Sequence, residues 1–500
     1  MTAEHVEARP GGYADSVTLM RVSADVRQAD GVQAALVAMA TELNLDLLLA
    51  MGFQPPPGVQ ADHLLIAVRA SDDATLSSAV AAVDVALSAR PADSHDGVRA
   101  VSPRTTAAAV RARGPGLALI SVPGRCAFAE AIDALDAGCD VMIFSDNVPV
   151  EQEIMLKDIA AQRELIVMGP DCGTAIVGGV GLGFSHSLAA GPVGLVAASG
   201  TGAQQVLCLL DHAKVGVSAA IGVGGRDLSA AVGGRSARAA LTALDADPRT
   251  ELIVVVSKPP AADVAARLRE FAGALATPVQ FALIGPGEPD LTAAAETALR
   301  ALDVTVPAWP SWPGQTASAQ PAGALRGLFA GGTLCDEAMV IATERLGPIW
   351  SNIPLRPDLR VAPRALASRA ATVGTTSTRH VMIDFGDDEL TAGRAHPMID
   401  QELRLARLAA EAADPGVSVV LLDVVLGHAA HPDPAAELGP AIAAARARGD
   451  LAVVVSLIGA TSDPQHPARQ AATLQAAGAH VFASNAAATR FACDLAGGVT

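Results

Sequence analysis

The sequence contains few aromatic residues and few lysines, and these scarcities narrow the kinds of protein that it can encode. Aromatic side chains make up 3% of the 500 residues, whereas hydrophobic residues as a whole make up 51%. This balance, dominated by alanine, valine, leucine and glycine, is typical of parallel sheets covered by helices. Only Lys157, Lys214 and Lys258 are lysines, and the net charge is −17. Because sequence-independent nucleic-acid binding needs a basic surface, we expect no nucleic-acid partner.

Paired cysteines and long apolar runs are missing as well. The six cysteines are scattered singly, without a Cys-x-x-Cys pair, which disfavours structural zinc and a disulfide framework. The N-terminus lacks a basic segment followed by an apolar stretch, so we expect no secretory signal. No uninterrupted apolar run reaches the roughly 18 residues that a membrane helix needs. We therefore expect a cytoplasmic protein that has no metal site and does not associate with a membrane.

The most informative feature that is present is a strand–glycine–helix pattern that occurs twice. Val193–Ala198 reads as a buried strand and runs into Ser199-Gly200-Thr201-Gly202 and a helical pattern, and Leu325–Ala330 runs likewise into Gly331-Gly332-Thr333. This repeated order predicts two copies of one α/β domain. Each helix would begin with free N–H groups and a partial positive charge, so both turns are predicted to bind phosphate or carboxylate. The alternative is that the glycines only turn the chain from strand to helix.

Strand and helix patterns alternate with short loops from Leu117 onward, which predicts right-handed βαβ units and parallel sheets. Upstream, where the order is less regular, strands are expected at Asp15–Leu19, Ala34–Met39 and His63–Val68. The chain length suggests about three domains. We place them at residues 1–190, 191–302 and 325–500, with a proline-rich linker at residues 303–324. Trp309 and Trp312, within that linker, are expected to pack on a domain surface.

Polar residues concentrate at the carboxyl ends of the expected strands, where open parallel sheets bind their ligands. Besides the two glycine-rich turns, the residues predicted to bind phosphate or substrate there are Asn147, Gly225, Arg226, Asp463 and Gln465. Arg226 could clamp a carboxylate or phosphate with its two-pronged guanidinium. The alternative for Arg226 is an ion pair with Asp227 or with a neighbouring helix.

The last third of the chain carries the densest set of titratable side chains. Seventeen residues contain Asp384, Asp387, Asp388, Glu389, Arg394, His396 and Asp400, and His428, His431 and Asp433 follow later. Such a cluster can serve as an acid/base pair, a metal site or a phosphoryl acceptor. The metal interpretation is weak, because His428 and His431 match no recognised spacing. We predict that His396 or His428 accepts a proton in catalysis, oriented by Asp384 or Asp387. For any single acidic residue, helix capping and loop hydrogen bonding are the alternative.

Longer stretches then become recognisable. VPGRCAFAEAIDALDAGCDVMIFSDNVP with LIVMGPDCG resembles the CoA-binding domain of the succinyl-CoA synthetase α subunit. VGLVAASGTGAQQV with IGVGGRDL resembles that subunit's second, flavodoxin-like domain, whose Ser-Gly-Thr turn holds phosphate. The third domain resembles the C-terminal ligase domain of the β subunit. The resemblance implies an α/β protein in which a Rossmann-like CoA-binding domain is followed by two flavodoxin-like parallel-sheet domains.

The similarity to the FdrA family is closer and covers nearly the whole chain. It rests on YADSVTLM (13–20), SDNVPVEQEI (145–154), GPDCGTAI (169–176), GGTLCDEA (331–338), HPMID (396–400) and SDPQ (462–465). This resemblance implies a subunit of a carbamoyltransferase of bacterial purine (allantoin) breakdown. The enzyme would interconvert carbamoyl phosphate plus oxamate with oxalurate plus phosphate, beside companion subunits of a hetero-oligomeric complex. We expect small anionic substrates and self-association; no cofactor is required, although CoA is a possible ligand.

The sequence departs from the succinyl-CoA synthetases at one site that matters for mechanism. Those enzymes carry a phosphohistidine in a Gly-His-Ala-Gly stretch near the end of the second domain, whereas this chain has no histidine between His212 and His380. It also lacks an ATP-grasp domain within its 500 residues. Two further interpretations stay open beside carbamoyl transfer. One is a ligase subunit of the succinyl-CoA type that obtains its nucleotide chemistry from a partner. The other is a CoA-binding regulatory scaffold without turnover.

Overall fold

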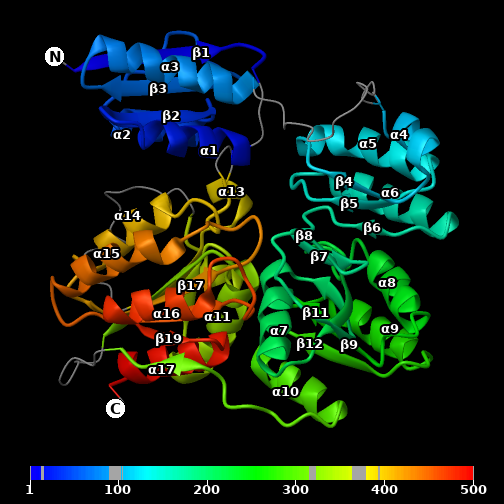
Figure 1. Ribbon diagram of the computed structural model, residues 1–500. Coiled ribbons are helices and arrows are strands. Elements are labelled where there is room, and N and C mark those ends of the chain that lie inside the picture. The colour runs from blue at the N-terminus through cyan, green and yellow to red at the C-terminus, as the bar shows by residue number, and fades with distance from the viewer. Residues whose placement is uncertain are drawn as a thin grey trace. The chain divides into compact units, whose positions relative to one another are not determined.

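The computed structural model describes residues 2–12, 16–88, 103, 105–314, 323–362, 379–391 and 395–498. The chain forms two compact units, shown in Figure 1. The first unit consists of Met1–Ser102 with Asp388–Asp400, and the second of Pro103–Asp387 with Gln401–Thr500. Among the described residues, no helix is both long and apolar enough to cross a lipid bilayer.

The first unit is built on an antiparallel sheet with the strand order β1-β3-β2. Its elements are β1 (Ala3–Arg9), α1 (Ser16–Arg27), β2 (Val32–Met39), α2 (Glu42–Ala50), β3 (Leu64–Ala70), α3 (Asp73–Ser88) and α13 (Asp388–Thr391). The strands expected at Ala34–Met39 and His63–Val68 are confirmed. The strand expected at Asp15–Leu19 is wrong where the structure describes it, because a helix begins at Ser16. Leu19, Val22 and Val26 are buried. Their spacing of three and four residues places them on one face of a helix, which favours a helix over a strand here.

The second unit begins with a small parallel sheet of the order β4-β5-β6. Its elements are α4 (Thr106–Arg113), β4 (Leu117–Ile120), α5 (Gly124–Asp136), β5 (Asp140–Ile143), α6 (Val150–Gln162) and β6 (Val167–Met168). Ala127, Ala131 and Leu135 of α5 pack with Val141 and Ile143 of β5 in one apolar cluster. These are the βαβ units that the alternating pattern after Leu117 predicts.

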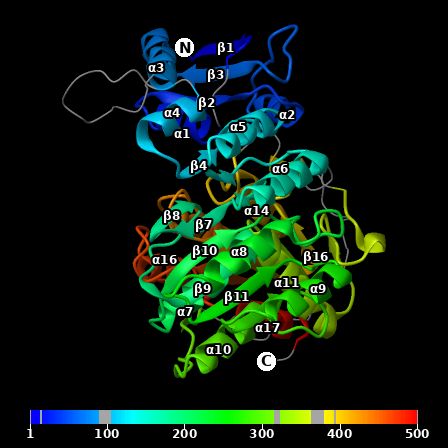
Figure 2. The ribbon, with the colours of Figure 1, turned by 90° about the vertical axis from the view of Figure 1, so that its right-hand side faces the viewer.

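The next sheet has the order β12-β11-β9-β10-β7-β8. Its elements are β7 (Thr174–Val177), β8 (Val180–Gly183), β9 (Ala190–Ala198), α7 (Gly200–His212), β10 (Val217–Gly222), α8 (Arg235–Asp245), β11 (Leu252–Ser257), α9 (Ala262–Ala272), β12 (Val279–Leu283) and α10 (Leu291–Ala301). Strands β9 to β12 are parallel, and β7 and β8 form an antiparallel hairpin at one edge. Figure 2 shows β9, β10 and β11 side by side.

The last sheet has the order β13-β19-β18-β17-β14-β16-β15. Its strands are β13 (Ser311–Trp312), β14 (Ala324–Phe329), β15 (Ile349–Ser351), β16 (His380–Asp384), β17 (Val417–Val425), β18 (Ala452–Ile458) and β19 (His480–Phe482). Its helices are α11 (Gly332–Leu346), η1 (Pro357–Leu359), α14 (Glu402–Glu411), α15 (Pro434–Arg446), α16 (Pro467–Ala476) and α17 (Asn485–Ala496). All described strands except β13 are parallel to their neighbours.

The two larger sheets repeat one topology. The order β10-β9-β11-β12 in the first corresponds to β16-β14-β17-β18 in the second, which is the flavodoxin-like order 2-1-3-4. In both sheets the central strand, β9 or β14, is followed directly by a glycine-rich turn and a helix. The predicted α/β fold with two flavodoxin-like sheets is therefore confirmed. Trp309, in the expected linker, donates a hydrogen bond of 3.0 Å from its indole nitrogen to Glu296 of α10.

Candidate functional site

The two repeated turns begin their helices at the same place in the second unit. Ser199 caps α7, and its hydroxyl accepts a 3.0 Å hydrogen bond from the N–H of Gly202. The same hydroxyl donates a 2.7 Å hydrogen bond to the hydroxyl of Thr333, in the first turn of α11. A methyl group added at Gly331 would lie only 2.7 Å from the side chain of Thr201. The prediction that each turn leads from a strand into a helix is confirmed, and the structure brings the two helix starts into contact.

A buried ion pair holds the second turn in shape. The Asp423 carboxylate, on β17, accepts hydrogen bonds of 2.7 Å from the N–H of Ala330 and 2.8 Å from that of Gly331. Arg404 of α14 reaches the same carboxylate at 3.0 Å, and both side chains are almost fully buried. Because the buried carboxylate accepts from three donors, it fixes the backbone that immediately precedes α11. The orientation of the other N–H groups at the N-terminus of α11 is thereby fixed as well.

Lys258 follows β11 and lies between two glycines of the two sheets. A methyl group added at Gly225 would lie 3.8 Å from Lys258 Nζ and 3.5 Å from Asp171 Oδ2. A methyl group added at Gly332 would lie 3.6 Å from the same Nζ and 2.6 Å from Asp384 Oδ2. The ammonium group is therefore next to the start of α11 and next to the Gly224-Gly225 turn, with carboxylates on both sides. We call Ser199, Thr333, Lys258, Gly332 and Asp384 the helix-start site.

Two carboxyl groups of this region bind protons unusually tightly. Burial raises the pKa of Asp384 to about 8, although Lys258 pulls it in the opposite direction and Gly386 donates a hydrogen bond to the carboxylate. Burial also raises the pKa of Asp336, in the first turns of α11, to about 6. At neutral pH Asp384 is therefore mainly a neutral acid. The positive charge of Lys258 and of the helix starts is then less compensated, which favours an anionic ligand.

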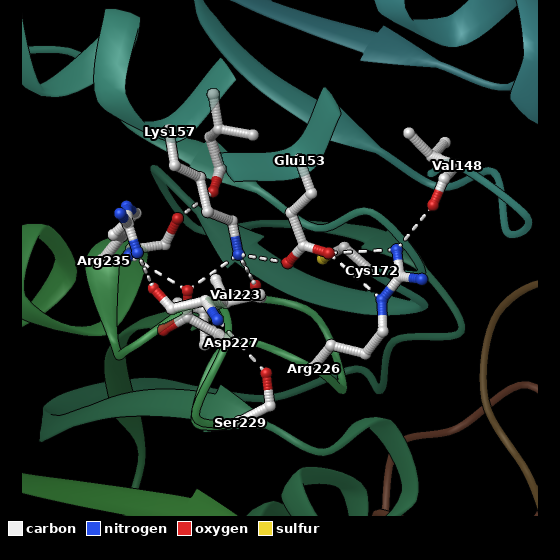
Figure 3. Close-up of polar contacts among 12 residues, drawn as sticks. Val148, Glu153, Lys157, Cys172, Val223, Arg226, Asp227, Ser229 and Arg235 are labelled. Carbon is white, nitrogen blue, oxygen red and sulfur yellow. Dashed lines mark hydrogen bonds and ion pairs between the residues drawn. The ribbon is translucent and has the colours of Figure 1, made fainter. Parts of the chain in front are cut away.

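Arg226 does not lie free at the end of its glycine-rich turn. Its guanidinium forms an ion pair of 3.0 Å with Glu153 of α6 and donates a 2.8 Å hydrogen bond to the carbonyl of Val148 (Figure 3). Lys157, one helical turn after Glu153, is buried and reaches Glu153 at 2.8 Å, Asp227 at 2.7 Å and the carbonyl of Val223 at 2.9 Å. This network secures the Gly224-Gly225 turn against α6, and the ion pair to a neighbouring helix is what the alternative for Arg226 predicted.

A second group of predicted residues meets elsewhere in the second unit. Gln465 donates a 2.7 Å hydrogen bond to the carbonyl of Gly427, next to His428. The buried Asp463 contacts His186 Nδ1 at 2.6 Å. His428 Nε2 lies 3.0 Å from the hydroxyl of Ser187, which is its side-chain partner in the described structure in place of Asp384 or Asp387. Sequence reasoning overlooked His186 and Ser187, because they lie outside any strand or helix and match no motif of known chemistry.

The other predicted residues lie in separate places. Asn147 has a positive φ of 54° and packs against Gly124 at the start of α5. Asp387 follows β16 and raises the pKa of Asp384 by its charge. His396 belongs to the first compact unit and accepts a 3.2 Å hydrogen bond from the N–H of Met398. Arg394 lies outside the described residues.

Some known proteins are similar to nearly the whole chain, and others are similar to parts of it. The chain is 37% identical over 507 aligned residues to the uncharacterized protein YahF of Escherichia coli strain K12, and the alignment covers 95% of each protein. It is 30% identical over 160 residues to the α subunit of ADP-forming succinate–CoA ligase of Aquifex aeolicus, covering 31% of this chain and 51% of that subunit. Residues 328–495 match the CoA-ligase family, and residues 1–103 match the family described as AllF, heavy metal-associated domain.

A solved structure shares only a distant likeness. The dinucleotide-forming acetyl-coenzyme A synthetase 1 of Ca. Korarchaeum cryptofilum, in complex with phosphate and ADP, is 15% identical. The likeness covers 77% of this chain and 82% of that chain with a TM-score of 0.27.

The heavy-metal name of the N-terminal family does not fit the residues of this chain. Soft metal ions are held by thiolate ligands, and the sequence has no cysteine before Cys126. Within the described part of the chain, no three histidine, cysteine, aspartate or glutamate side chains lie close enough together to hold a metal ion. The described residues of the first unit therefore offer no ligand set on which a metal-dependent step could be built.

Proposed function

The chain belongs to the family of YahF, an FdrA/AllF-like group of the succinyl-CoA synthetase type, and we propose that it transfers acyl groups from an acyl phosphate bound at the helix-start site. The observation that carries the proposal is the contact between the first turns of α7 and α11, made by Ser199 and Thr333. Two helix starts that converge offer several N–H groups and two partial positive charges to one phosphoryl group.

Lys258 supplies the full charge that such a ligand needs. Its ammonium group is the neighbour of Gly225 and Gly332, so it can bind a phosphate oxygen as that phosphate leaves the acyl carbon. Asp384, whose pKa is raised to about 8 by burial, can donate its proton to another phosphate oxygen at neutral pH. In the transfer, the acceptor forms a bond to the acyl carbon, the bond from that carbon to the phosphate oxygen breaks, and the acceptor's proton passes to a base.

The acceptor that we propose first is a thiol such as CoA, with nucleotide chemistry supplied by a partner subunit. The match of residues 328–495 to the CoA-ligase family supports this acceptor. Carbamoyl transfer to oxamate is the second candidate. It is favoured by one observation: the segment between His212 and His380 has no histidine. Carbamoyl transfer from carbamoyl phosphate needs neither a phosphohistidine nor nucleotide chemistry from a partner subunit, whereas the ligase reaction needs that partner.

The test is a turnover assay of the full chain, alone and together with candidate partner subunits. Acetyl phosphate or succinyl phosphate with CoA, and carbamoyl phosphate with oxamate, are each followed by phosphate release and by product mass. Thioester formation supports the ligase reaction, and oxalurate formation supports carbamoyl transfer. Either product should be lost in Lys258→Met and retained in Lys214→Met, since Lys214 is exposed and follows α7. Absence of both products in the complete complex would contradict the proposal.

A further inference from the structure

Ser187 and His428 form a serine–histidine pair that the helix-start site does not use. The Ser187 hydroxyl lies 3.0 Å from Nε2 of His428, although 241 residues separate the two in sequence. Ser187 is half-buried and His428 is exposed, so a ligand can reach both. A hydroxyl within hydrogen-bond reach of an imidazole nitrogen is the arrangement that activates serine as a nucleophile.

The serine side of the pair is held by a buried carboxylate. Asp463 accepts hydrogen bonds from the N–H of Ser187 at 2.9 Å and from the N–H of Ala460 at 2.7 Å. The same carboxylate contacts His186 Nδ1 at 2.6 Å, and both side chains are fully buried. With three partners around one carboxylate, the backbone of Ser187 has a single position, which is what a nucleophile needs.

The histidine side is held by strained backbone. The N–H of His428 donates a 2.7 Å hydrogen bond to the carbonyl of Ser185. Its two neighbours, Gly427 and Ala429, have φ angles of 106° and 62°. The left-handed region is unfavourable for alanine, and a methyl group at Gly427 would lie 2.4 Å from the Ser185 carbonyl oxygen. The loop thus contains an unfavourable φ at Ala429 and a close backbone contact at Gly427. Together with the hydrogen bond to Ser185, these features hold His428 against Ser187.

A buried polar atom of the residue before Ser187 lacks a partner among the described residues. Nε2 of His186 is buried and has no hydrogen-bond partner among the described residues. Buried polar atoms of this kind are rare in folded proteins, because leaving one unpaired costs about 1–3 kcal/mol. This buried ring belongs to the residue directly before Ser187, and its other nitrogen contacts Asp463, which holds the backbone of Ser187.

We propose that Ser187 is a nucleophile, with His428 as its general base, that takes up an acyl group from an activated ester or acyl phosphate. Ser187 Oγ forms a bond to the acyl carbon, the bond from that carbon to the leaving oxygen breaks, and the serine proton passes to His428 Nε2 and then to the leaving group. Water or another acceptor, deprotonated by His428, then releases the acyl group. This activity is independent of the helix-start site.

The experiment uses p-nitrophenyl acetate as the acyl donor for the full chain. Nitrophenol release and the mass of the Ser187 peptide are measured for the wild type, Ser187→Ala, Ser187→Cys, His428→Gln and the control His431→Asn. His431 lies in the same loop, and its ring nitrogen accepts the N–H of Asp433. We expect one acetyl group on Ser187 in the wild type and in His431→Asn, and none in Ser187→Ala. His428→Gln should slow acetylation by about a hundredfold, and Ser187→Cys should retain labelling.

The variants keep the fold intact by design, because the side chain of Ser187 contacts His428 near the surface; melting curves check this. Nitrophenol release by Ser187→Ala at the wild-type rate, or a wild-type Ser187 peptide without acetyl in samples quenched with acid during turnover, would overturn the proposal.

Discussion

The hydroxyl of Ser199 donates a 2.7 Å hydrogen bond to the hydroxyl of Thr333, and this bond joins two copies of one fold at their equivalent helix starts. Each copy alone would offer one helix start to an anion. Their contact brings two such starts together, beside Lys258. The pairing is therefore the structural basis for an anion site in a chain whose net charge is −17, because a local field can oppose the charge of the whole protein.

The two equivalent glycines at the helix starts should respond differently to alanine. The added methyl group of Gly332→Ala would lie 2.6 Å from Asp384 Oδ2, whereas that of Gly200→Ala has nothing nearer than Thr174 Oγ1 at 4.0 Å. We expect Gly332→Ala to lower the free energy of unfolding by about 1–3 kcal/mol. Gly200→Ala should be neutral or slightly stabilising, because alanine favours the helix. Urea unfolding of both variants measures the difference; equal stabilities would show that the close approach at Gly332 is not real.

Lys157 should be the lysine whose loss costs most stability. Lys157→Met leaves Glu153 and Asp227 buried without their shared cation (Figure 3). Breaking a buried ion pair in this way costs about 3–5 kcal/mol. The same substitution at the exposed Lys214 is the control and should change stability by less than about 0.5 kcal/mol. Chemical unfolding monitored by circular dichroism compares the two, and a loss below about 1 kcal/mol for Lys157→Met would contradict a structural role for the network.

Asp384 should make the protein less stable as pH rises. In the folded protein its pKa is raised to about 8, against 3.8 for an ordinary aspartate. Between these two values the folded state binds more protons than the unfolded state, so the free energy of unfolding falls with increasing pH. Asp384→Asn should remove this slope and raise the free energy of unfolding near pH 8 by on the order of 1–3 kcal/mol.

The control for that prediction is Asp245→Asn. The pKa of the half-buried Asp245 is lowered by the hydrogen bond that it accepts from the N–H of Thr277. Asp245 therefore adds to the free energy of unfolding at pH values above the usual pKa of aspartate, and this contribution is lost as the pH falls. The pH dependence due to Asp245 thus has the opposite sign to that due to Asp384. If Asp384→Asn and the wild type show parallel stability curves between about pH 5 and about pH 8, Asp384 is ionised in the folded protein.

Local patterns predicted the parts of the fold that they determine. The run from Val193 into Ser199-Gly200 predicted a strand end, a cap and a helix, because apolar burial, capping and glycine all act within a few residues. The prediction of a strand at Asp15–Leu19 was wrong, because the pattern of apolar and polar residues in so short a segment fits a strand as well as a helix. Only the longer spacing of Leu19, Val22 and Val26 distinguishes the two.

The site was harder to predict, because its contacts join distant segments. The two glycine-rich turns were placed at strand ends, but only the structure brings Lys258 next to both Gly225 and Gly332. The partner of His428 is Ser187, far away in sequence and without a motif. Arg226 was expected to bind substrate, whereas in the structure its guanidinium forms an ion pair with Glu153. Local sequence patterns do not predict which side chains from distant segments come into contact in the folded protein.

The most direct test of the account is the affinity of the full chain for acetyl phosphate, measured by isothermal titration calorimetry. A charged hydrogen bond contributes about 1.5–3 kcal/mol, so Lys258→Met should weaken binding by about tenfold to a hundredfold. Lys214→Met is the control, because it removes the same charge at an exposed position. The account predicts wild-type affinity in Lys214→Met and a clear loss in Lys258→Met. Equal affinity of the wild type and Lys258→Met would contradict an acyl-phosphate site between α7 and α11.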